Sequence, residues 1–184
     1  MTAPLSRFII LVGPRGSGKT TLGHALARSI DVPVYDTDRM VEERTGEPVS
    51  RLWEREGEGA FREWESRVLQ TLGEFPPGVL STGGGIVLSA DNRQLLSGLG
   101  PVFYLHVPVE QLVTRLSNAY EKRPRLRGEI PLSEEIRQVA LERDPLYREV
   151  ATHVVETGGH SIAGTVEEIL RLLRTTHSSG GGRR

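Results

Sequence analysis

The sequence predicts an α/β fold in three layers, with a parallel β-sheet covered by helices on both faces. Two observations lead to this prediction. Short apolar runs rich in β-branched residues alternate along the chain with longer amphipathic stretches. A glycine-rich loop at residues 13–20 directly follows the first apolar run and opens the first amphipathic stretch. Because parallel strands need helical crossovers, this alternation places helices on both sides of one sheet.

The first half of the chain supplies two strand–helix units and then a further helix. Arg7–Val12 is an apolar run, as expected of a strand buried on both faces, and the helix after the glycine loop extends to about Ile30. A short strand at Val34–Tyr35 precedes a helix that ends near Gly46. Glu58–Leu72 then reads as an amphipathic helix whose apolar face consists of Phe61, Trp64, Val68, Leu69 and Leu72.

The second half repeats the alternation. Strands are expected at Val79–Ser81, Val102–Leu105 and His153–Glu156, and helices at Ser133–Tyr147 and Ile162–Leu173. We expect one domain over residues 1–174, since 184 residues suit a single core. A polar, proline-bearing stretch at about 117–131 is a candidate mobile lid, and residues 175–184 are expected to be a disordered tail.

Composition excludes several classes of protein. A net charge of −1 argues against a nucleic-acid binder built on a basic field, and the absence of cysteine excludes disulfides. No apolar run approaches the roughly 20 residues that a membrane span needs. The first residues lack the charged-then-apolar order of a signal peptide. We therefore expect a cytoplasmic protein with no membrane or nucleic-acid partner.

The glycine-rich loop fits the phosphate-binding pattern G-x-x-x-x-G-K-[ST] at every fixed position. Its backbone N–H groups and the following helix N-terminus suit a phosphate anion. Lys19 is one of only two lysines, and it is expected to reach the β- and γ-phosphates of ATP, while Thr20 offers a hydroxyl to Mg²⁺. The pattern alone does not separate kinases from ATPases, GTPases or motor proteins. The predicted nucleotide-binding residues are Gly13, Pro14, Arg15, Gly16, Ser17, Gly18, Lys19, Thr20 and Thr21.

Two carboxylates follow the second strand. Asp36 and Asp38 are two residues apart, so that one can serve a cation and the other a hydroxyl group. The alternative is that Asp38 caps a helix beginning at Arg39.

Arginines and glycines form the remaining candidate site. Arg62 and Glu65 are one helical turn apart, so Glu65 can orient a guanidinium that binds a carboxylate bidentately; a solvated ion pair is the alternative. Gly83–Gly85 follow a strand and can expose N–H groups to a ligand, or else form a flexible loop. Further arginines in basic stretches are Arg115, Arg123 and Arg143.

From about Phe8 to Arg174 these blocks resemble the shikimate kinase family in order and separation, and are most similar to its shikimate kinase II branch. The resemblance implies a P-loop fold of nucleoside-monophosphate-kinase type, with a five-stranded parallel sheet of order 2-3-1-4-5. It also implies a substrate-binding region at about 37–65 and the lid at about 117–131. The family's usual leucine after the lid proline is Arg125 here, which leaves lid packing open.

The resemblance further implies a role for each matched residue. Asp36 would lie near magnesium through water, and Asp38 would hold substrate hydroxyls and accept the proton. Arg62 and Arg143 would bind the substrate carboxylate, with the Gly83–Gly85 loop against the substrate. Arg123 would reach the ATP phosphates from the lid, and Arg115 would pack on adenine.

The function implied is ATP- and Mg²⁺-dependent phosphorylation of the 3-hydroxyl of shikimate to shikimate 3-phosphate and ADP, by a cytoplasmic monomer. This is a step of chorismate and aromatic amino acid biosynthesis. Lys19, Asp38 and Arg123 are the expected catalytic residues. Two alternatives are another small-molecule kinase, such as a gluconate kinase, and a kinase-like module that senses a metabolite without turnover.

Overall fold

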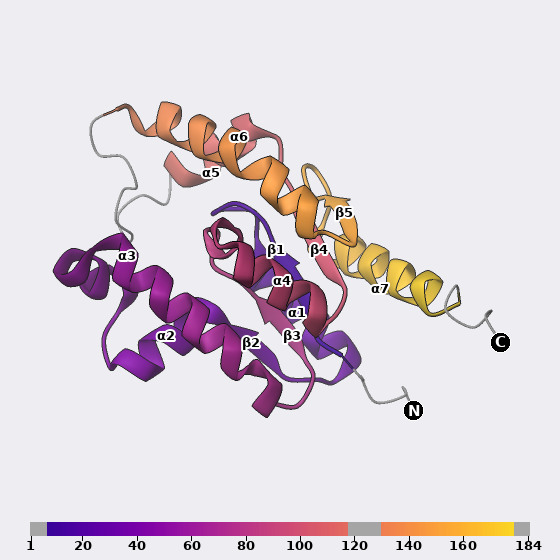
Figure 1. Cartoon of the computed structure of the whole chain (residues 1–184). Coiled ribbons are helices and arrows are strands. Elements are labelled where there is room, and N and C mark those ends of the chain that lie inside the picture. The colour runs from indigo at the N-terminus through magenta and orange to yellow at the C-terminus, as the bar shows by residue number, and fades with distance from the viewer. Residues whose placement is uncertain (1–6, 118–129, 179–184) are drawn as a thin grey trace.

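A five-stranded parallel sheet forms the centre of the computed structural model, which describes residues 7–117 and 130–178, with side chains to residue 175 (Figure 1). Neighbouring strands pair in parallel in the order β2-β3-β1-β4-β5. This confirms the predicted order. The strands are β1 (Ile9–Val12), β2 (Val34–Asp36), β3 (Val79–Ser81), β4 (Val102–His106) and β5 (His153–Glu156).

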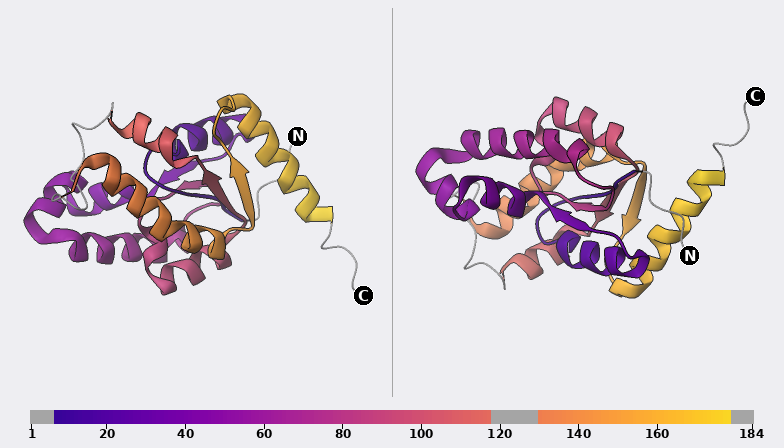
Figure 2. Two further views of the ribbon diagram at one scale, coloured as in Figure 1. Left: turned by 90° about the horizontal axis from the view of Figure 1, so that it is seen from above. Right: turned by 90° about the horizontal axis from the view of Figure 1, so that it is seen from below.

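Helices cover both faces of the sheet, because β1 is apolar on both sides. Ile9 and Leu11 pack in one hydrophobic cluster with residues of α1 (Lys19–Ile30) and α7 (Ile162–Ser178). Ile10 and Val12 face the opposite cluster, which α3 (Val49–Gln70), α4 (Ala90–Leu99) and α6 (Leu132–Val150) help to form. Figure 2 shows the two helical layers with the sheet between them. The predicted three-layer arrangement is therefore confirmed.

The segment from α2 (Thr37–Thr45) to α3 extends beyond the sheet beside its carboxyl edge (Figure 1). Helix α3 begins at Val49, nine residues before the predicted start at Glu58, and it is interrupted at Gly57, where φ is 83° and ψ is 177°. Only glycine adopts such angles readily, so Gly57 separates two helical pieces. Glu58 opens the second piece, and η1 (Thr71–Glu74) follows its end.

The remaining helical elements follow β3 and β4 along the chain. The chain passes from β3 through η2 (Ile86–Leu88) to α4, whose N-cap Ser89 accepts a hydrogen bond from Asn92 N. Helix α5 (Val109–Ser117) packs on α6 through a small cluster that includes Leu112 and Ile136. Within the described residues, no helix is long and apolar enough to cross a bilayer.

The two expectations about uncertain segments have different outcomes. Helix α7 continues to Ser178, so residues 175–178 are helical and not part of a disordered tail. The hydroxyl of Thr175 donates to the carbonyl of Leu172 at 2.8 Å, within this last turn. Residues 179–184 lie outside the described residues, as does most of the predicted lid, residues 118–129.

Candidate active site

The phosphate loop connects the end of β1 to the start of α1, as its sequence pattern requires. Gly16 and Gly18 have φ values of 81° and 91°, which favour glycine, and the turn they make brings Lys19 beneath the loop. The Lys19 side chain is buried, and its Nζ donates to the carbonyls of Gly13 and Pro14 at 2.8 Å each. An ammonium group beneath a glycine-rich loop at a helix N-terminus is suited to a phosphate anion.

Thr20 and Asp36, the two predicted magnesium residues, lie in contact. Thr20 Oγ1 donates to Asp36 Oδ2 at 3.0 Å, because β2 ends beside the first turn of α1. Both are oxygen ligands, the type that Mg²⁺ prefers, and a hydroxyl–carboxylate pair leaves the remaining ligands to phosphate and water. Among the described residues no group of three or more His, Cys, Asp or Glu side chains that could hold a metal ion occurs.

The helix cap lies on a different aspartate from the one considered in the sequence. Helix α2 begins at Thr37 and not at Arg39, so its N-cap is Asp36. Asp36 Oδ1 accepts the backbone N–H groups of Asp38 and Arg39 at 3.1 and 3.4 Å. The capping alternative for Asp38 is therefore wrong. Asp38 instead lies in the first turn of α2.

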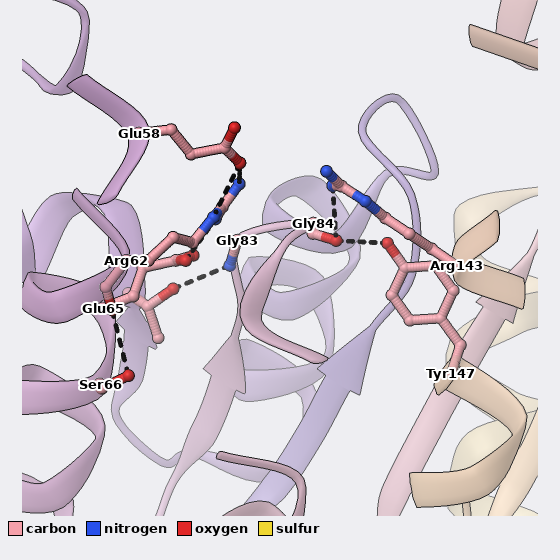
Figure 3. A network of polar contacts seen from close by, with 9 residues as sticks. Glu58, Arg62, Glu65, Ser66, Gly83, Gly84, Arg143 and Tyr147 are labelled. Atoms are coloured by element: carbon pink, nitrogen blue, oxygen red, sulfur yellow. Dashed lines mark hydrogen bonds and ion pairs between the residues drawn. The ribbon is translucent and has the colours of Figure 1, made fainter. Parts of the chain in front are cut away.

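Arg62 is fixed by two carboxylates of its own helix. Its Nη1 donates to Glu65 Oε2, which confirms the predicted ion pair, and its Nε and Nη2 donate to Glu58 Oε1 at 3.2 and 3.0 Å (Figure 3). The guanidinium also lies 5.5 Å from the ring centroid of Trp53. Glu58 was missed in the sequence, although its position four residues before Arg62 is the usual spacing of such a pair.

Glu65 is a fully buried carboxyl group. Its burial raises its pKa to about 7, the Arg62 guanidinium opposes this shift, and the nearby Asp38 carboxylate adds to it. Oε2 has Arg62 as its partner, whereas Oε1 is buried without a hydrogen bond. A desolvated acid beside a second carboxylate is typical of functional sites.

The three glycines after β3 are the positions at which the other parts of the site approach closely. A Cβ built on Gly83 would lie 2.3 Å from Glu65 Oε1 and 2.7 Å from Asp38 Oδ1. A Cβ on Gly85 would lie 2.2 Å from Cζ of Arg62. The absence of a side chain at Gly83 and Gly85 therefore leaves room for these side chains in their present positions, a reason that the sequence pattern did not contain.

Gly84, the central glycine, is held in place on two sides. A Cβ there would lie 3.2 Å from the backbone nitrogen of Arg15, in the phosphate loop. Its carbonyl oxygen accepts Arg143 Nη1 at 3.2 Å and the Tyr147 hydroxyl, both from α6 (Figure 3). The alternative of a flexible loop does not fit these contacts. Tyr147 was missed as a site residue, although it lies one helical turn after Arg143.

The remaining arginines fall on different elements. Arg115, at the end of α5, donates from Nη1 to the carbonyl of Gly16 at 3.2 Å, so it lies against the phosphate loop. Arg123 lies outside the described residues. All other predicted site residues belong to the phosphate loop, the end of β2, the start of α2, α3, the glycine loop or α6.

A phosphate loop beside guanidinium groups suited to a second anion is the arrangement of a small-molecule kinase, and this is the class of protein that the fold and site define. A family model described as "Shikimate kinase" matches residues 15–174. The chain therefore belongs to the shikimate kinase family, and it is a phosphotransferase.

Individual relatives agree with the family model. The shikimate kinase of Nitrosococcus oceani is 46% identical over 90% of this chain and 86% of its own length. "Shikimate kinase 2" of Escherichia coli O139:H28 is 42% identical over 96% of this chain and 98% of its own length.

Solved structures extend the comparison. The structure described as "Shikimate kinase from Acinetobacter baumannii in complex with shikimate" superposes with a TM-score of 0.84 at 39% identity, covering 92% of this chain and 94% of the other. A gluconokinase from Sinorhizobium meliloti 1021 has a TM-score of 0.59 at 18% identity, over 96% of this chain and 99% of its own. That second likeness shows a common fold alone.

Proposed function

We propose that the protein transfers the γ-phosphoryl group of ATP to the 3-hydroxyl of shikimate, giving shikimate 3-phosphate and ADP. The observation that carries the proposal is that Arg62 and Arg143, from two different helices, both lie at the Gly83–Gly85 loop. The same loop adjoins the phosphate loop through Gly84. Two guanidinium groups beside a phosphate loop suit a small acceptor that carries a carboxylate and hydroxyl groups, and the Acinetobacter baumannii relative was solved with shikimate.

The nucleotide is assigned to the phosphate loop, residues Gly13 to Thr21. Lys19 would exchange its bonds to the Gly13 and Pro14 carbonyls for the β- and γ-phosphates. Arg115, already against Gly16, is assigned to the adenine side. Arg123 is assigned to the phosphates on the strength of the lid motif. Positively charged side chains that contact the γ-phosphoryl group offset its negative charge in the transition state.

Magnesium is assigned to Thr20 and Asp36, whose oxygens are 3.0 Å apart. When bound there, it supplies charge neutralisation for the nucleotide phosphates. Its remaining ligands would come from phosphate and water, as is usual for Mg²⁺.

The substrate is assigned to the opposite side of the glycine loop. Arg62 and Arg143 bind the shikimate carboxylate, each through parallel N–H donors. The Glu58 and Glu65 carboxylates hold Arg62 in place before substrate arrives, which reduces the entropy lost on binding. Asp38 positions the 3-hydroxyl and accepts its proton as the oxygen attacks the γ-phosphorus and ADP leaves.

The test is a coupled ADP-release assay with shikimate, quinate, gluconate and nucleoside monophosphates as acceptors. We expect turnover with shikimate and little above background with gluconate or nucleotides. Equal turnover with gluconate would refute the substrate and leave the phosphate-loop assignment intact. Binding of shikimate without ADP release with any acceptor would favour the sensory module instead.

The assembly and location of the enzyme are part of the same proposal. We expect a monomer in the cytoplasm. Sedimentation at the mass of one 20.3 kDa chain, with full activity at that concentration, is the expected result.

A further inference from the structure

The Gly84 carbonyl oxygen accepts hydrogen bonds from two side chains of α6, as Figure 3 shows. The donors are Arg143 and Tyr147, which are four residues apart and so project from the same face of the helix. Gly84 is also the residue at which the glycine loop approaches the phosphate loop. The position of the Gly84 peptide group therefore affects both the phosphate loop and the side of the site that contains Arg143.

The two donors differ in how firmly they are held. Tyr147 is fully buried, and its ring stacks on that of Tyr104 with centroids 5.0 Å apart and an interplanar angle of 27°. Burial raises the pKa of Tyr147 to about 12, so its hydroxyl keeps its proton at neutral pH. Arg143 is only partly buried and has a longer side chain. Tyr147 is the rigid donor of the pair, and Arg143 is the adaptable one.

We propose that Tyr147 is a positioning residue of the carboxylate site: its hydroxyl fixes the Gly84 carbonyl oxygen, and that oxygen orients the Arg143 guanidinium toward the shikimate carboxylate. The inference rests on the proposed function, in which Arg143 binds that carboxylate. It adds a role that the sequence pattern did not suggest, since a tyrosine on one face of a helix is normally interpreted as a core-packing residue.

The variant Tyr147→Phe tests the role of the hydroxyl group separately from that of the aromatic ring. The variant keeps the volume and the stack on Tyr104. It loses the bond from the hydroxyl to the Gly84 carbonyl oxygen and the hydrogen-bonding contact of the hydroxyl with the Arg143 side chain. A net hydrogen bond corresponds to about a two- to tenfold change in an equilibrium constant. We therefore expect the shikimate KM to rise by about that factor, with the ATP KM and kcat within about twofold of wild type.

Tyr104→Phe is the matched control. It removes the hydroxyl of the other ring in the stack, which donates to Asp144 Oδ1 at 2.8 Å and does not reach Gly84. Asp144 keeps its ion pair with Arg148. We expect a wild-type shikimate KM in this variant.

A double-mutant cycle tests whether Tyr147 acts through Arg143. In an Arg143→Ala background, Tyr147→Phe should change the shikimate dissociation constant by less than about twofold, because the group that it positions is gone. The same loss in both backgrounds, or a wild-type KM in Tyr147→Phe, would overturn the inference. So would a parallel rise of the ATP and shikimate KM with lower thermal stability, which is the mark of a purely structural role.

The same measurements keep the two proposals apart. An inactive wild-type enzyme with shikimate would refute the proposed function and this inference with it. An active wild-type enzyme with unaltered kinetics in Tyr147→Phe would refute the inference alone.

Discussion

At the scale of single residues, Asp36 and Asp38 are near neighbours whose carboxylates have separate surroundings. Asp36 accepts the Thr20 hydroxyl with Oδ2 and caps α2 with Oδ1. Asp38 Oδ1 is buried and faces Gly83, beside Glu65. The different contacts predict different consequences when each acid is replaced by its amide.

Asp38→Asn should remove the proton acceptor with little effect on the fold. Asn has the same size, and the cap of α2 belongs to Asp36, so thermal stability should change little. Loss of a general base typically costs about 10²–10⁴ in rate. We expect kcat to fall in that range at any magnesium concentration. Near-normal turnover would show that Asp38 is not the base.

Asp36→Asn should act through the metal. Asn caps helices about as well as Asp, so α2 should remain intact. The variant should need more Mg²⁺ for half-maximal activity, and extra Mg²⁺ should restore part of the rate. A loss of rate that Mg²⁺ titration leaves unchanged would contradict the metal assignment.

Glu65 predicts an unusual dependence of stability on pH. Its burial raises the folded-state pKa to about 7, above the value of about 4.3 in an unfolded chain. Between these values the folded protein binds more protons than the unfolded one, so the contribution of Glu65 to stability is complete below about pH 4 and lost as pH rises through 7.

Glu65→Gln, which cannot titrate, is the reference for this measurement. The free energy of unfolding of the wild type relative to Glu65→Gln should fall between pH 5 and pH 8 in denaturant titrations. A difference that instead grows with pH would mean that Arg62 dominates burial and lowers the pKa of Glu65.

At the scale of elements, the glycine loop is the point where α2, α3, α6 and the phosphate loop meet. Its three residues have no side chains, so their neighbours determine the shape of the site. Gly83 N donates to Thr37 Oγ1 at 2.8 Å, which attaches the loop to α2 as well. Substitutions here should disturb binding more than folding.

Gly85→Ala should displace Arg62. The backbone φ of −101° suits alanine, but the new methyl group would lie 2.2 Å from Cζ of Arg62. The end of a flexible side chain can move aside, so the protein should fold. Charge-assisted hydrogen bonds are worth about 1.5–3 kcal/mol, so the shikimate KM should rise by roughly ten- to a hundredfold while the ATP KM stays the same.

Gly98→Ala is the control for this change, since a Cβ in that part of α4 would meet nothing within 4 Å. It should leave both KM values unchanged. An unaltered shikimate KM in Gly85→Ala would show that Arg62 does not bind the substrate from its present position.

The elements that were predicted well are those with an uninterrupted local signal. The strands Val79–Ser81 and His153–Glu156 match their predicted bounds, because each is a short run between turn residues. Helix α4 was missed, since its sequence is short and contains Asn, Ser and Gly, which disfavour helix. The predicted helix Glu58–Leu72 covers only the second half of α3, because Gly57 and Gly59 conceal the continuity of the helix.

The features of the candidate site also differ in whether the sequence could predict them. The phosphate loop and the Arg62–Glu65 pair follow from local spacing and were predicted. The bond of Tyr147 to Gly84 joins residues 63 positions apart, and the approach of Arg62 to Gly85 likewise joins separate elements. Contacts of this kind depend on how α3 and α6 pack on the sheet, which no local pattern contains.

At the scale of the whole molecule, the helices on the two faces of the sheet contribute differently to substrate binding and to stability. Helices α3 and α6 carry Arg62 and Arg143, the residues assigned to the shikimate carboxylate, on one face. On the other face α7 packs with α1, whose site residues are assigned to the nucleotide and magnesium. The second face should therefore influence stability more than substrate binding.

Ile169→Ala tests this division. Ile169 is fully buried in the cluster formed by α1, α7 and the sheet, so its truncation should cost about 2–5 kcal/mol of unfolding free energy. The shikimate KM of the folded variant should remain at the wild-type value. Ile162→Ala, on the same helix but 50% exposed, is the control and should change stability by less than about 0.5 kcal/mol. A raised shikimate KM in Ile169→Ala would contradict this division of the faces.

The central position of β1 has a consequence for how the chain is made. Synthesis proceeds from the N-terminus, so this wholly apolar strand is translated first, yet its partner in β3 lies 70 residues later, at Ile9 and Val79. At about 5–20 residues per second, the ribosome needs roughly 4–14 s to deliver that partner. During this interval Ile9–Val12 has no sheet to join. We therefore expect that early burial of this strand against α1, or binding by a chaperone, protects the nascent chain from aggregation until β3 is made.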